Sequence, residues 1–390
     1  MKKYLVLLGA MLINLLFGFQ YTWAIFDRIL IDTYGLSAKS TQFVFSSQVV
    51  TFALAFVFAG RIIDHVSTRV TTIAGALIYG GGLVLAWRGG PNPVTLVLGV
   101  GLCYGLGLAL GYIGPLVTAV KWFPERKGLA TGFVVGAFGS GSLFFSAAVK
   151  ALIAWGMSMF TIFLLVGISC AAGIILLSFS LVEPPSIAPE TERKAPLPPG
   201  LLRTRAFWSL VAGFLACTLA GLSIVGSLEK IGKTAGAPEA YLTLCVTVLA
   251  LGNTTGRPGW GMITELIGTR RAVLWLILLQ AAFITAMIFL GRFGPAFVAL
   301  SFLIGFNYGG TFVLYVTEVA KSYGPERVGS VYGLVFVVYA ASGLLGPTSS
   351  GFSHDRWHSY VPSMAYASAV LVAGAIAFFL LYRRPADTTL

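Results

Sequence analysis

A single arginine deep inside a long apolar stretch is the residue best suited to binding an anion. Arg257 precedes Glu265, which marks the end of that stretch, by eight residues, so a helix would carry it about 12 Å inward. A formal charge at such a depth is costly in hydrocarbon and marks a binding site or a pathway. Its planar guanidinium can hold a carboxylate through two parallel hydrogen bonds. The alternative is a structural arginine whose long side chain extends to the nearby interface.

The residues next to Arg257 favour a binding role. Asn253 is four residues earlier and therefore on the same face of a helix. Pro258 has no backbone N–H, which leaves the carbonyl oxygen of Thr254 without its helical partner. Glycines crowd positions 252 to 261, and a polar, irregular stretch of this kind is tolerated at depth where it lines a cavity. Because no Asp or Glu lies on this stretch, the expected counterion is an anionic substrate.

These residues must be positioned by membrane-spanning helices, as the composition indicates. Of the 390 residues, 57% are hydrophobic and only 10% are charged, far from the composition of soluble globular proteins. Apolar windows recur along the chain, and each can cross a hydrocarbon core of about 30 Å as a helix. The predicted fold is therefore an all-α membrane protein of twelve transmembrane helices. They cover residues 4–26, 41–63, 71–88, 94–119, 128–153, 157–182, 206–228, 238–263, 272–290, 295–319, 328–349 and 361–382.

The net charge of +12 is explained by membrane topology and does not require a nucleic-acid partner. With the N-terminus placed in the cytoplasm, seventeen Lys and Arg fall on the inner side and eight on the outer side, while Arg257 belongs to neither set. This bias predicts a multi-pass protein of the cell membrane with both termini cytoplasmic. Basic residues spread over many short loops form no nucleic-acid-binding stripe.

The sequence predicts no catalytic, metal or cofactor site. All four cysteines fall inside predicted helices, where thiols act as small apolar residues. No cluster of His, Cys or carboxylate residues lies within the predicted spans, so an enzyme is not expected. The first apolar stretch follows two lysines as a signal peptide does, but it is long and has no convincing cleavage site, so it is predicted to be the first helix.

Two patterns repeat with the same offset of 201 residues, which indicates an internal duplication. A Gly-x-x-x-acid pattern follows the second and the eighth predicted helix, with its acid at Asp64 and at Glu265. A Pro-Glu-Arg-x-Gly-x-x-x-Gly pattern opens the fifth helix at Pro124 and the eleventh at Pro325. Two patterns that share one offset are unlike a chance match.

The repeat divides the chain into two six-helix bundles, residues 1–182 and 206–390, joined by a polar, proline-rich cytoplasmic linker at 183–205. Such bundles, each with an acid–Gly–Arg loop after its second helix, resemble the major facilitator superfamily. The resemblance implies two bundles that rock about a midplane site to give alternating access. It also implies gating charges near the helix ends, for which setting the topology is the alternative role. The gating candidates are Asp64, Arg69, Glu265, Arg270, Arg126 and Arg327.

Aromatic and amide side chains inside the predicted helices are further candidates for lining the site. By the 201-residue offset, Phe56 is the counterpart of Arg257, so one half offers a cation and the other a ring. That asymmetry fits a small molecule with one carboxylate and a short carbon tail. For each candidate taken alone, packing against a neighbouring helix is the alternative role. The candidates are Asn14 and Tyr21 in the first helix, Tyr104 and Tyr112 in the fourth, Tyr308 in the tenth, and Tyr332, Phe336 and Tyr339 on one face of the eleventh.

Longer motifs resemble those of the monocarboxylate transporters, and especially of their microbial oxalate/formate branch. Residues 121–132 read Lys-Trp-Phe-Pro-Glu-Arg-Lys-Gly-Leu-Ala-x-Gly, which is similar to the family signature entering the fifth helix. Asn-x-x-x-Arg-Pro at 253–258 is similar to the Asp-x-x-x-Arg-Pro of the animal proteins, whose arginine engages the carboxylate, and this role carries over to Arg257. Gly-Phe-x-Tyr-Gly at 305–309 is similar too, and in the family an aromatic side chain at the Tyr308 position restricts substrate size.

Departures from the family pattern narrow the expected substrate. Asn253 replaces the family's aspartate, so the carboxylate usually credited with proton handling is missing at that position. Ile25 stands where the animal proteins carry a lysine, and Ser342 stands where the oxalate/formate exchangers carry one. A site with one buried cation should favour a monoanion over oxalate.

The leading hypothesis is therefore a secondary transporter of short monocarboxylates such as L-lactate and pyruvate, driven by co-transport of a proton. The expected partners are the anion, the proton and the lipid bilayer, and the monomer is the expected working unit. Two alternatives stay open. One is an organic-anion exchanger of the oxalate/formate type, and the other is a membrane sensor that binds a carboxylate without transporting it.

Overall fold

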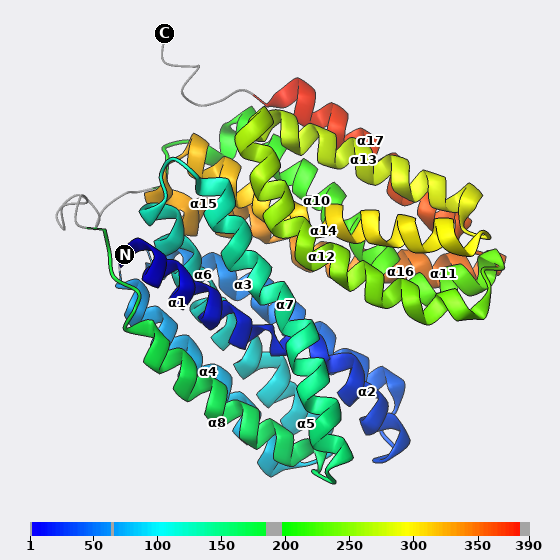
Figure 1. The fold of residues 1–390 in the computed structure, drawn as a ribbon, viewed down its shortest axis with the longest axis horizontal. Helices are drawn as coiled ribbons and strands as arrows, with labels where there is room; N and C mark the ends of the chain where they lie inside the picture. The colour runs from blue at the N-terminus through cyan, green and yellow to red at the C-terminus, as the bar shows by residue number, and fades with distance from the viewer. Residues whose placement is uncertain (1, 64–65, 185–196, 383–390) are drawn as a thin grey trace. The chain divides into compact units, whose positions relative to one another are not determined.

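The computed structural model describes residues 2–63, 66–184 and 197–382, and within these ranges the regular structure is entirely helical (Figure 1). In chain order the helices are α1 (Lys2–Phe17), η1 (Gly18–Thr22), α2 (Trp23–Asp32), α3 (Ala38–Ile63), α4 (Thr68–Gly89), α5 (Pro93–Leu96), η2 (Val97–Tyr104), α6 (Gly105–Trp122), α7 (Lys127–Ala154), α8 (Met159–Ser178), η3 (Leu201–Arg203), α10 (Arg205–Val225), α11 (Leu228–Ala235), α12 (Glu239–Ile267), α13 (Thr269–Leu290), α14 (Gly294–Ser322), η4 (Pro325–Arg327), α15 (Val328–Phe336), α16 (Val338–Trp357) and α17 (Val361–Leu381). The all-α fold class predicted from the sequence is confirmed.

Each of the twelve predicted spans coincides with one long helical segment of the described chain, and three of these segments are irregular along their length. The first passes through the 3₁₀ turn η1, the fourth through the π-helix η2, and the eleventh breaks between α15 and α16. Irregular turns inside a long helix are frequent at functional sites, because they reorient side chains that a regular helix would place elsewhere.

The helix that carries the predicted site differs in composition from the other spans. Within the described ranges, eleven helical segments are long and apolar enough to cross a membrane. The remaining long helix is α12, which has 29 residues and carries Asn253, Arg257 and Pro258 in its second half. These groups lower its apolar content without shortening it, and they suit a buried face of α12 better than a lipid-facing one.

The chain forms two compact units that do not follow the chain order completely. Unit 1 contains Met1–Glu125, Ala137–Ala195 and Pro325–Leu334, and unit 2 contains Arg126–Gly136, Pro196–Gly324 and Val335–Leu390. The units therefore differ from the predicted bundles 1–182 and 206–390 by the exchange of two short segments. Both exchanged segments belong to the repeated Pro-Glu-Arg pattern. Of the predicted linker, residues 185–196 lie outside the described chain.

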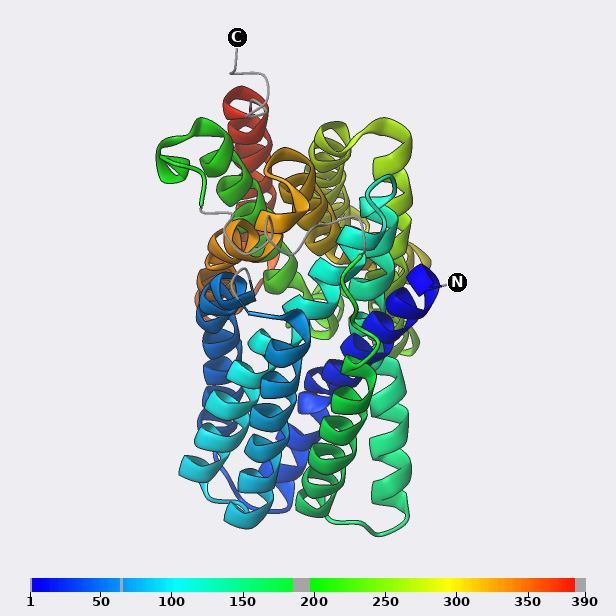
Figure 2. The same cartoon turned by 90° about the vertical axis from the view of Figure 1, so that its left-hand side faces the viewer.

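Unit 1 is built around α4, which packs against α6 and α8 (Figures 1 and 2). Glycines allow these backbones to approach closely. A Cβ atom added at Gly75 of α4 would lie 2.5 Å from the backbone nitrogen of Gly111 on α6. Close approach of small residues is a common way to stabilise helix pairs where apolar burial alone cannot, as in a lipid environment.

Unit 2 is built around the pair α12 and α14, which lie side by side (Figure 1). The helices α10 and α13 each pack against both α14 and α17. Gly252 and Gly256 bring α12 against the backbone of Phe302 and Phe306 on α14, since a Cβ atom at either glycine would collide with that backbone. The close contact holds the polar middle of α12 in a defined position next to α14.

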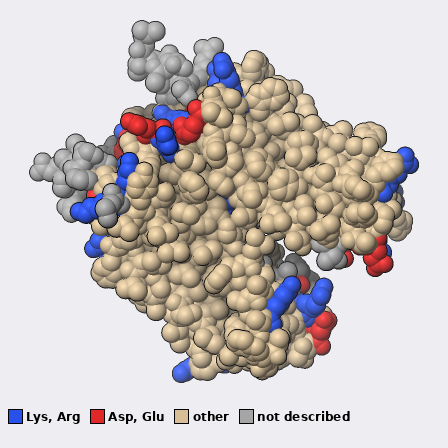
Figure 3. Space-filling model, viewed as in Figure 1, with Lys and Arg blue, Asp and Glu red and all other residues tan. Residues whose placement is uncertain are grey.

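The surface agrees with a lipid-facing protein. On the face shown in Figure 3, acidic and basic side chains gather mainly near the ends of the helices, and the sides between them are uncharged. Large apolar side chains are exposed in the described chain, among them Phe58, Leu77 and Leu176. An apolar surface this extensive is expected only where lipid or a partner covers it.

Candidate functional site

Arg257 is held in place by groups of unit 2 and is almost completely buried, with 1% of its surface exposed. Its Nε donates a hydrogen bond to Oδ1 of Asn253 at 3.2 Å, and Nη1 donates to the carbonyl oxygen of Val135. The guanidinium carbon lies 5.7 Å from the ring centroid of Phe312. The side chain thus bonds one turn toward the start of α12, away from Glu265, and does not extend toward the end of the helix.

The start of α7 reaches Arg257 because its glycines have no side chains. A Cβ atom at Gly132 would lie 2.8 Å from the carbonyl oxygen of Arg257, and one at Gly136 would lie 3.4 Å from Cδ of Pro258. Gly132 is the last glycine of the repeated Pro-Glu-Arg pattern. Its role in the structure is to let α7 lie against α12 so that the Val135 carbonyl can receive the guanidinium.

Unit 1 contains the equivalent backbone contact. In it Gly333 takes the place of Gly132, and Phe56 takes the place of Arg257, each 201 residues away in the chain. A Cβ atom at Gly333 would lie 3.1 Å from the carbonyl oxygen of Phe56. Phe56 is fully buried, and its ring centroid lies 5.8 Å from that of Tyr332 and 5.9 Å from that of Tyr112. Two of the predicted site residues, Tyr112 and Tyr332, therefore meet around the repeat counterpart of Arg257.

Four rings of unit 2 form a cluster beside Arg257, which we call the aromatic cluster: Tyr308, Phe312, Phe336 and Tyr339. Phe312 lies at its centre, with ring centroids 5.4 Å from Tyr308, 6.4 Å from Phe336 and 5.7 Å from Tyr339. Sequence reasoning missed Phe312. Its position four residues after Tyr308, on the same face of α14, was the signal that could have identified it.

The three aromatic residues predicted to share a face of the eleventh helix are divided between the two units. Phe336 and Tyr339 are in contact, with ring centroids 5.1 Å apart. Tyr332 is instead part of unit 1 and contacts Phe56. The turn at Val337, between α15 and α16, lies between Phe336 and Tyr339, and the two rings meet across it.

Ser342, at the position where the oxalate/formate exchangers carry a lysine, is fully buried in unit 2. Its Oγ lies 2.7 Å from Oγ1 of Thr218 and donates to the carbonyl oxygen of Val338 at 3.0 Å. The serine hydroxyl therefore ties α16 to α10. A lysine at this position would bring a second cation into the interior of unit 2.

The candidates on the first helix belong to unit 1. Asn14 is fully buried, and neither atom of its side-chain amide has a hydrogen-bond partner among the described residues. Such an amide is costly to bury unless a ligand or water satisfies it. Tyr21 lies in η1, but its side chain is outside the described part of the structure.

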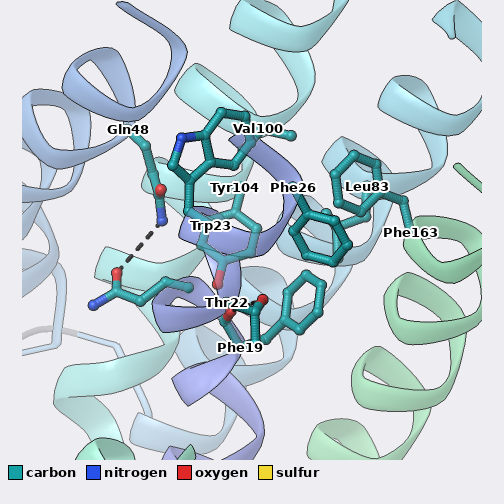
Figure 4. A pocket seen from close by; sticks show the side chains of 10 residues that line it. Phe19, Thr22, Trp23, Phe26, Gln48, Leu83, Val100, Tyr104 and Phe163 are labelled. Carbon is teal, nitrogen blue, oxygen red and sulfur yellow. Dashed lines mark hydrogen bonds between the residues drawn. The ribbon is translucent and has the colours of Figure 1, made fainter. Parts of the chain in front are cut away.

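A small cavity in unit 1, not expected from the sequence, adjoins the irregular turns η1 and η2 (Figure 4). It has room for about one water molecule. Nε2 of Gln48 donates to Oε1 of Gln20 at 3.4 Å on one side of it. Trp23 and Tyr104 also line the cavity. The predicted candidate Tyr104 is thus placed next to a small, mainly apolar cavity with the Gln20 and Gln48 amides at its edge, and not only against its neighbours.

Glu265 contacts the backbone at the start of α7. Its Oε1 accepts a hydrogen bond from the N–H of Gly128 at 2.9 Å, and a Cβ atom at Gly128 would lie 2.8 Å from the same oxygen. A carboxylate at a helix N-terminus is stabilised by the unpaired N–H groups and by the helix dipole. Within unit 2, this gating candidate is therefore bonded to a helix end.

The arginines predicted as gating groups lie near helix ends. Arg69 donates to the carbonyl oxygen of Phe179 at 3.4 Å and lies over its ring. Arg270 lies over the ring of Tyr382, at 5.7 Å. The remaining candidates are Arg327, whose Nη1 is 3.4 Å from Glu326, Arg126, which is exposed before α7, and Asp64, which lies outside the described residues.

Comparison with known proteins supports the resemblance found in the sequence. A family model described as Major Facilitator Superfamily matches residues 7–230 and 210–389. The chain is 24% identical to the oxalate:formate antiporter of Oxalobacter formigenes over 391 residues, which cover 98% of this chain and 92% of the relative. It is 26% identical to monocarboxylate transporter 3 of Rattus norvegicus, over 95% of this chain and 78% of the relative.

Solved structures show the same fold. The fucose:proton symporter FucP of E. coli superimposes with a TM-score of 0.70 at 14% sequence identity, over 96% of this chain and 98% of that chain. With the family match on both halves of the sequence, the predicted family is confirmed. The chain belongs to the major facilitator superfamily of multi-pass membrane transporters, as a relative of the monocarboxylate transporters and the oxalate:formate antiporter.

Proposed function

We propose that this transporter is a proton-coupled symporter of small monocarboxylates, L-lactate and pyruvate among them, and that it works by alternating access. The observation that carries the proposal is the buried Arg257 beside the aromatic cluster. Among the described residues, Arg257 is the only Lys or Arg with a buried side chain. One interior cation next to apolar rings matches a molecule with one carboxylate and a short apolar tail.

Substrate binding would use the guanidinium group of Arg257 in the orientation that it already has. The Val135 carbonyl bonds to Nη1 as a neutral acceptor, and a carboxylate is the stronger acceptor for a guanidinium. Asn253 holds Nε, which keeps the guanidinium plane oriented while the substrate binds. The aromatic cluster would contact the methyl end of the substrate. Tyr112 and Tyr332, in unit 1, remain predicted site residues.

Proton coupling follows from charge. Moving an anion into a negative-inside compartment costs about 2.3 kcal/mol per 100 mV, whereas an anion that moves with a proton crosses without net charge. We place the protein in the cell membrane as a working monomer with both termini in the cytoplasm. The bond between Glu265 and the start of α7 is proposed to close the cytoplasmic side and to open during the cycle.

The second candidate function is exchange of organic anions. It is favoured by the similarity over nearly the whole chain to the oxalate:formate antiporter of Oxalobacter formigenes. In an exchanger the loaded form crosses and the empty form does not, because the buried charge of Arg257 would be too costly to carry through the occluded state without its anion.

The proposal is tested with the purified protein in proteoliposomes. Uptake of radiolabelled L-lactate and pyruvate should rise when an inward proton gradient is imposed, and Arg257→Gln should abolish it. Arg292→Gln, at an exposed arginine before α14, is the matched control and should behave as wild type. Absence of lactate and pyruvate transport in wild type, with or without a gradient, would contradict the proposed substrate class. Transport that occurs only against internal anion would favour exchange.

A further inference from the structure

Glu318 is a buried acid that the substrate site does not use. It lies on α14, four residues before the last residue of that helix, Ser322, and its side chain is fully buried. Among the described residues no other Asp or Glu is buried. An ionisable group inside the membrane region is costly to maintain, and such groups are commonly part of ion or proton pathways.

The carboxyl group of Glu318 forms a hydrogen-bonded cluster with the hydroxyl groups of Tyr382 and Ser322. Its Oε1 accepts hydrogen bonds from the hydroxyl of Tyr382 and from Oγ of Ser322, the latter at 2.6 Å. The two hydroxyl oxygens are themselves 3.0 Å apart. A hydroxyl both donates and accepts, and a protonated carboxyl gains a donor of its own. The hydroxyl groups of Tyr382 and Ser322 can therefore bond to Oε1 of Glu318 in its charged or its neutral form by rotating.

Charged and titratable groups approach this hydrogen-bonded cluster from several helices. The guanidinium of Arg270 on α13 lies over the ring of Tyr382, at 5.7 Å. Nζ of Lys127, at the start of α7, donates to the carbonyl oxygen of Ala320 at 3.1 Å. Tyr323 follows α14, and its pKa is raised by burial and, in addition, by the negative charge of Glu318, while a hydrogen bond with Thr204 before α10 lowers it. Tyr323, directly after α14, is thus close enough to Glu318 for its pKa to be raised by that charge.

We propose that Glu318 is the proton-binding residue of the transport cycle, with Tyr382 and Ser322 as the groups that pass the proton to it and accommodate its neutral form. This inference rests on the proposed function. In each cycle a hydroxyl group of Tyr382 or Ser322 releases its own proton to Oε1 of Glu318 while its oxygen takes up a proton from water, and the reverse transfer later returns one proton to water on the other side. Asn253 cannot take this role because a side-chain amide does not titrate.

The placement on α14 explains how the proton and the substrate would be coupled. The same helix carries Phe312, which faces Arg257, six residues before Glu318 and so about 9 Å away along the axis. Protonation removes the negative charge of Glu318 from a region that Arg270 and Lys127 approach from α13 and α7, and we expect the end of α14 to shift against those helices as a result. A shift of α14 moves the aromatic cluster against Arg257, which connects protonation to substrate affinity.

The test compares two transport modes of the same proteoliposomes. One is lactate uptake driven by a proton gradient, and the other is counterflow, in which external labelled lactate exchanges for internal lactate at equal pH. Glu318→Gln keeps the shape but stays neutral, so gradient-driven uptake should fall at least about tenfold more than counterflow does. Glu318→Asp should retain stimulation by the gradient at a lower rate, and Tyr382→Phe should shift the pH dependence of uptake. Glu239→Gln, at an exposed acid that begins α12, is the matched control.

Four outcomes would overturn the inference, and they separate it from the proposed function. Unchanged gradient stimulation in Glu318→Gln removes Glu318 from proton transfer and leaves the symporter proposal intact. An equal loss of both modes in a Gln variant that remains monodisperse shows a structural role only. Counterflow in wild type with no response to a gradient identifies an exchanger with no coupled proton. Absence of both modes in wild type means that the proposed function itself is incorrect.

Discussion

Arg257 in unit 2 and Phe56 in unit 1 occupy equivalent positions of the repeat and are approached by the same backbone contact. Gly132 lies against the carbonyl of Arg257, and Gly333 lies against the carbonyl of Phe56. Around Arg257 the partners are an amide and a carbonyl oxygen, whereas around Phe56 they are the rings of Tyr112 and Tyr332. The two positions therefore share the helix contact and differ in the chemistry of the side chain that the contact positions.

The largest expected effect is at the position that makes the two regions different. Arg257→Gln removes the cation, and lactate affinity should fall by about 3 kcal/mol, or more than a hundredfold, since a buried carboxylate would lose its paired charge. Arg257→Lys keeps the charge but not the planar fork and should lose less. Phe56→Leu, the same position in the other unit, should change affinity only slightly. Equilibrium binding of lactate to the three purified variants is the measurement, and equal losses in Arg257→Gln and Phe56→Leu would contradict the comparison.

The shared contact can be broken on either side. Gly132→Ala places a methyl group 2.8 Å from the Arg257 carbonyl, and Gly333→Ala places one 3.1 Å from that of Phe56. Backbone must move in both variants, so thermal stability should fall by about 1–3 kcal/mol for Gly132→Ala and by less for Gly333→Ala. Only the first should also weaken lactate binding, because only that contact supports the Val135 carbonyl. The measurements are thermal unfolding and lactate binding of both variants. Weaker lactate binding in Gly333→Ala than in Gly132→Ala would contradict the assignment of the site to the Arg257 side.

A second cation should change the substrate preference of unit 2. Ser342→Lys puts an ammonium group into the region where Ser342 now bonds to Thr218, and a dianion gains a partner for its second carboxylate. The ratio of oxalate to lactate affinity should rise by about tenfold relative to wild type. Ser342→Met has a similar length without the charge and serves as the control for packing. Competition binding that already ranks oxalate above lactate in wild type would contradict the single-cation site.

A carboxylate introduced next to Arg257 should make binding depend on pH. Asn253→Asp places an acid where the amide oxygen is now 3.2 Å from Nε of Arg257. At neutral pH the new carboxylate competes with the substrate for the guanidinium, so lactate affinity should fall several-fold, by about 1 kcal/mol. Affinity should recover as the pH falls and the aspartate is protonated. Lactate affinity of both proteins is measured from about pH 5 to 8 at a fixed concentration of the lactate anion. Identical profiles would show that Asn253 does not address the bound anion.

The smallest effect is expected at the start of α7. Glu265→Gln keeps an oxygen that can accept the Gly128 N–H but removes the negative charge from the helix N-terminus, at a cost of about 0.3–1 kcal/mol. Thermal stability should fall by that amount, while lactate affinity at Arg257 stays as in wild type. A large loss of affinity would indicate that the contact controls the site directly and not only the closure of α7.

Local sequence patterns determined the part of this protein that depends on neighbours along one helix. The twelve apolar windows follow from the length and composition of each stretch, and the repeat follows from the shared 201-residue offset. The pairing of Asn253 with Arg257 follows from helical periodicity, because residues four apart share a face. Composition also determined that these helices face lipid. The family was recognisable for the same reason, since the motifs at 121–132 and 253–258 are continuous in the chain.

The tertiary structure decided which helices meet. Val135 and Arg257 are 122 residues apart, and Glu318 and Tyr382 are 64 residues apart, so no periodicity within one helix connects them. The exchange of the two Pro-Glu-Arg segments between the units was likewise invisible in chain order. Glu318 was overlooked as an acid at the end of a predicted span, where interfacial charges are ordinary, and its burial comes from Tyr382 and Ser322. Burial and long-range pairing are properties of packing between helices, and packing depends on close contacts, such as those of Gly132 and Gly256, that a hydrophobic pattern does not specify.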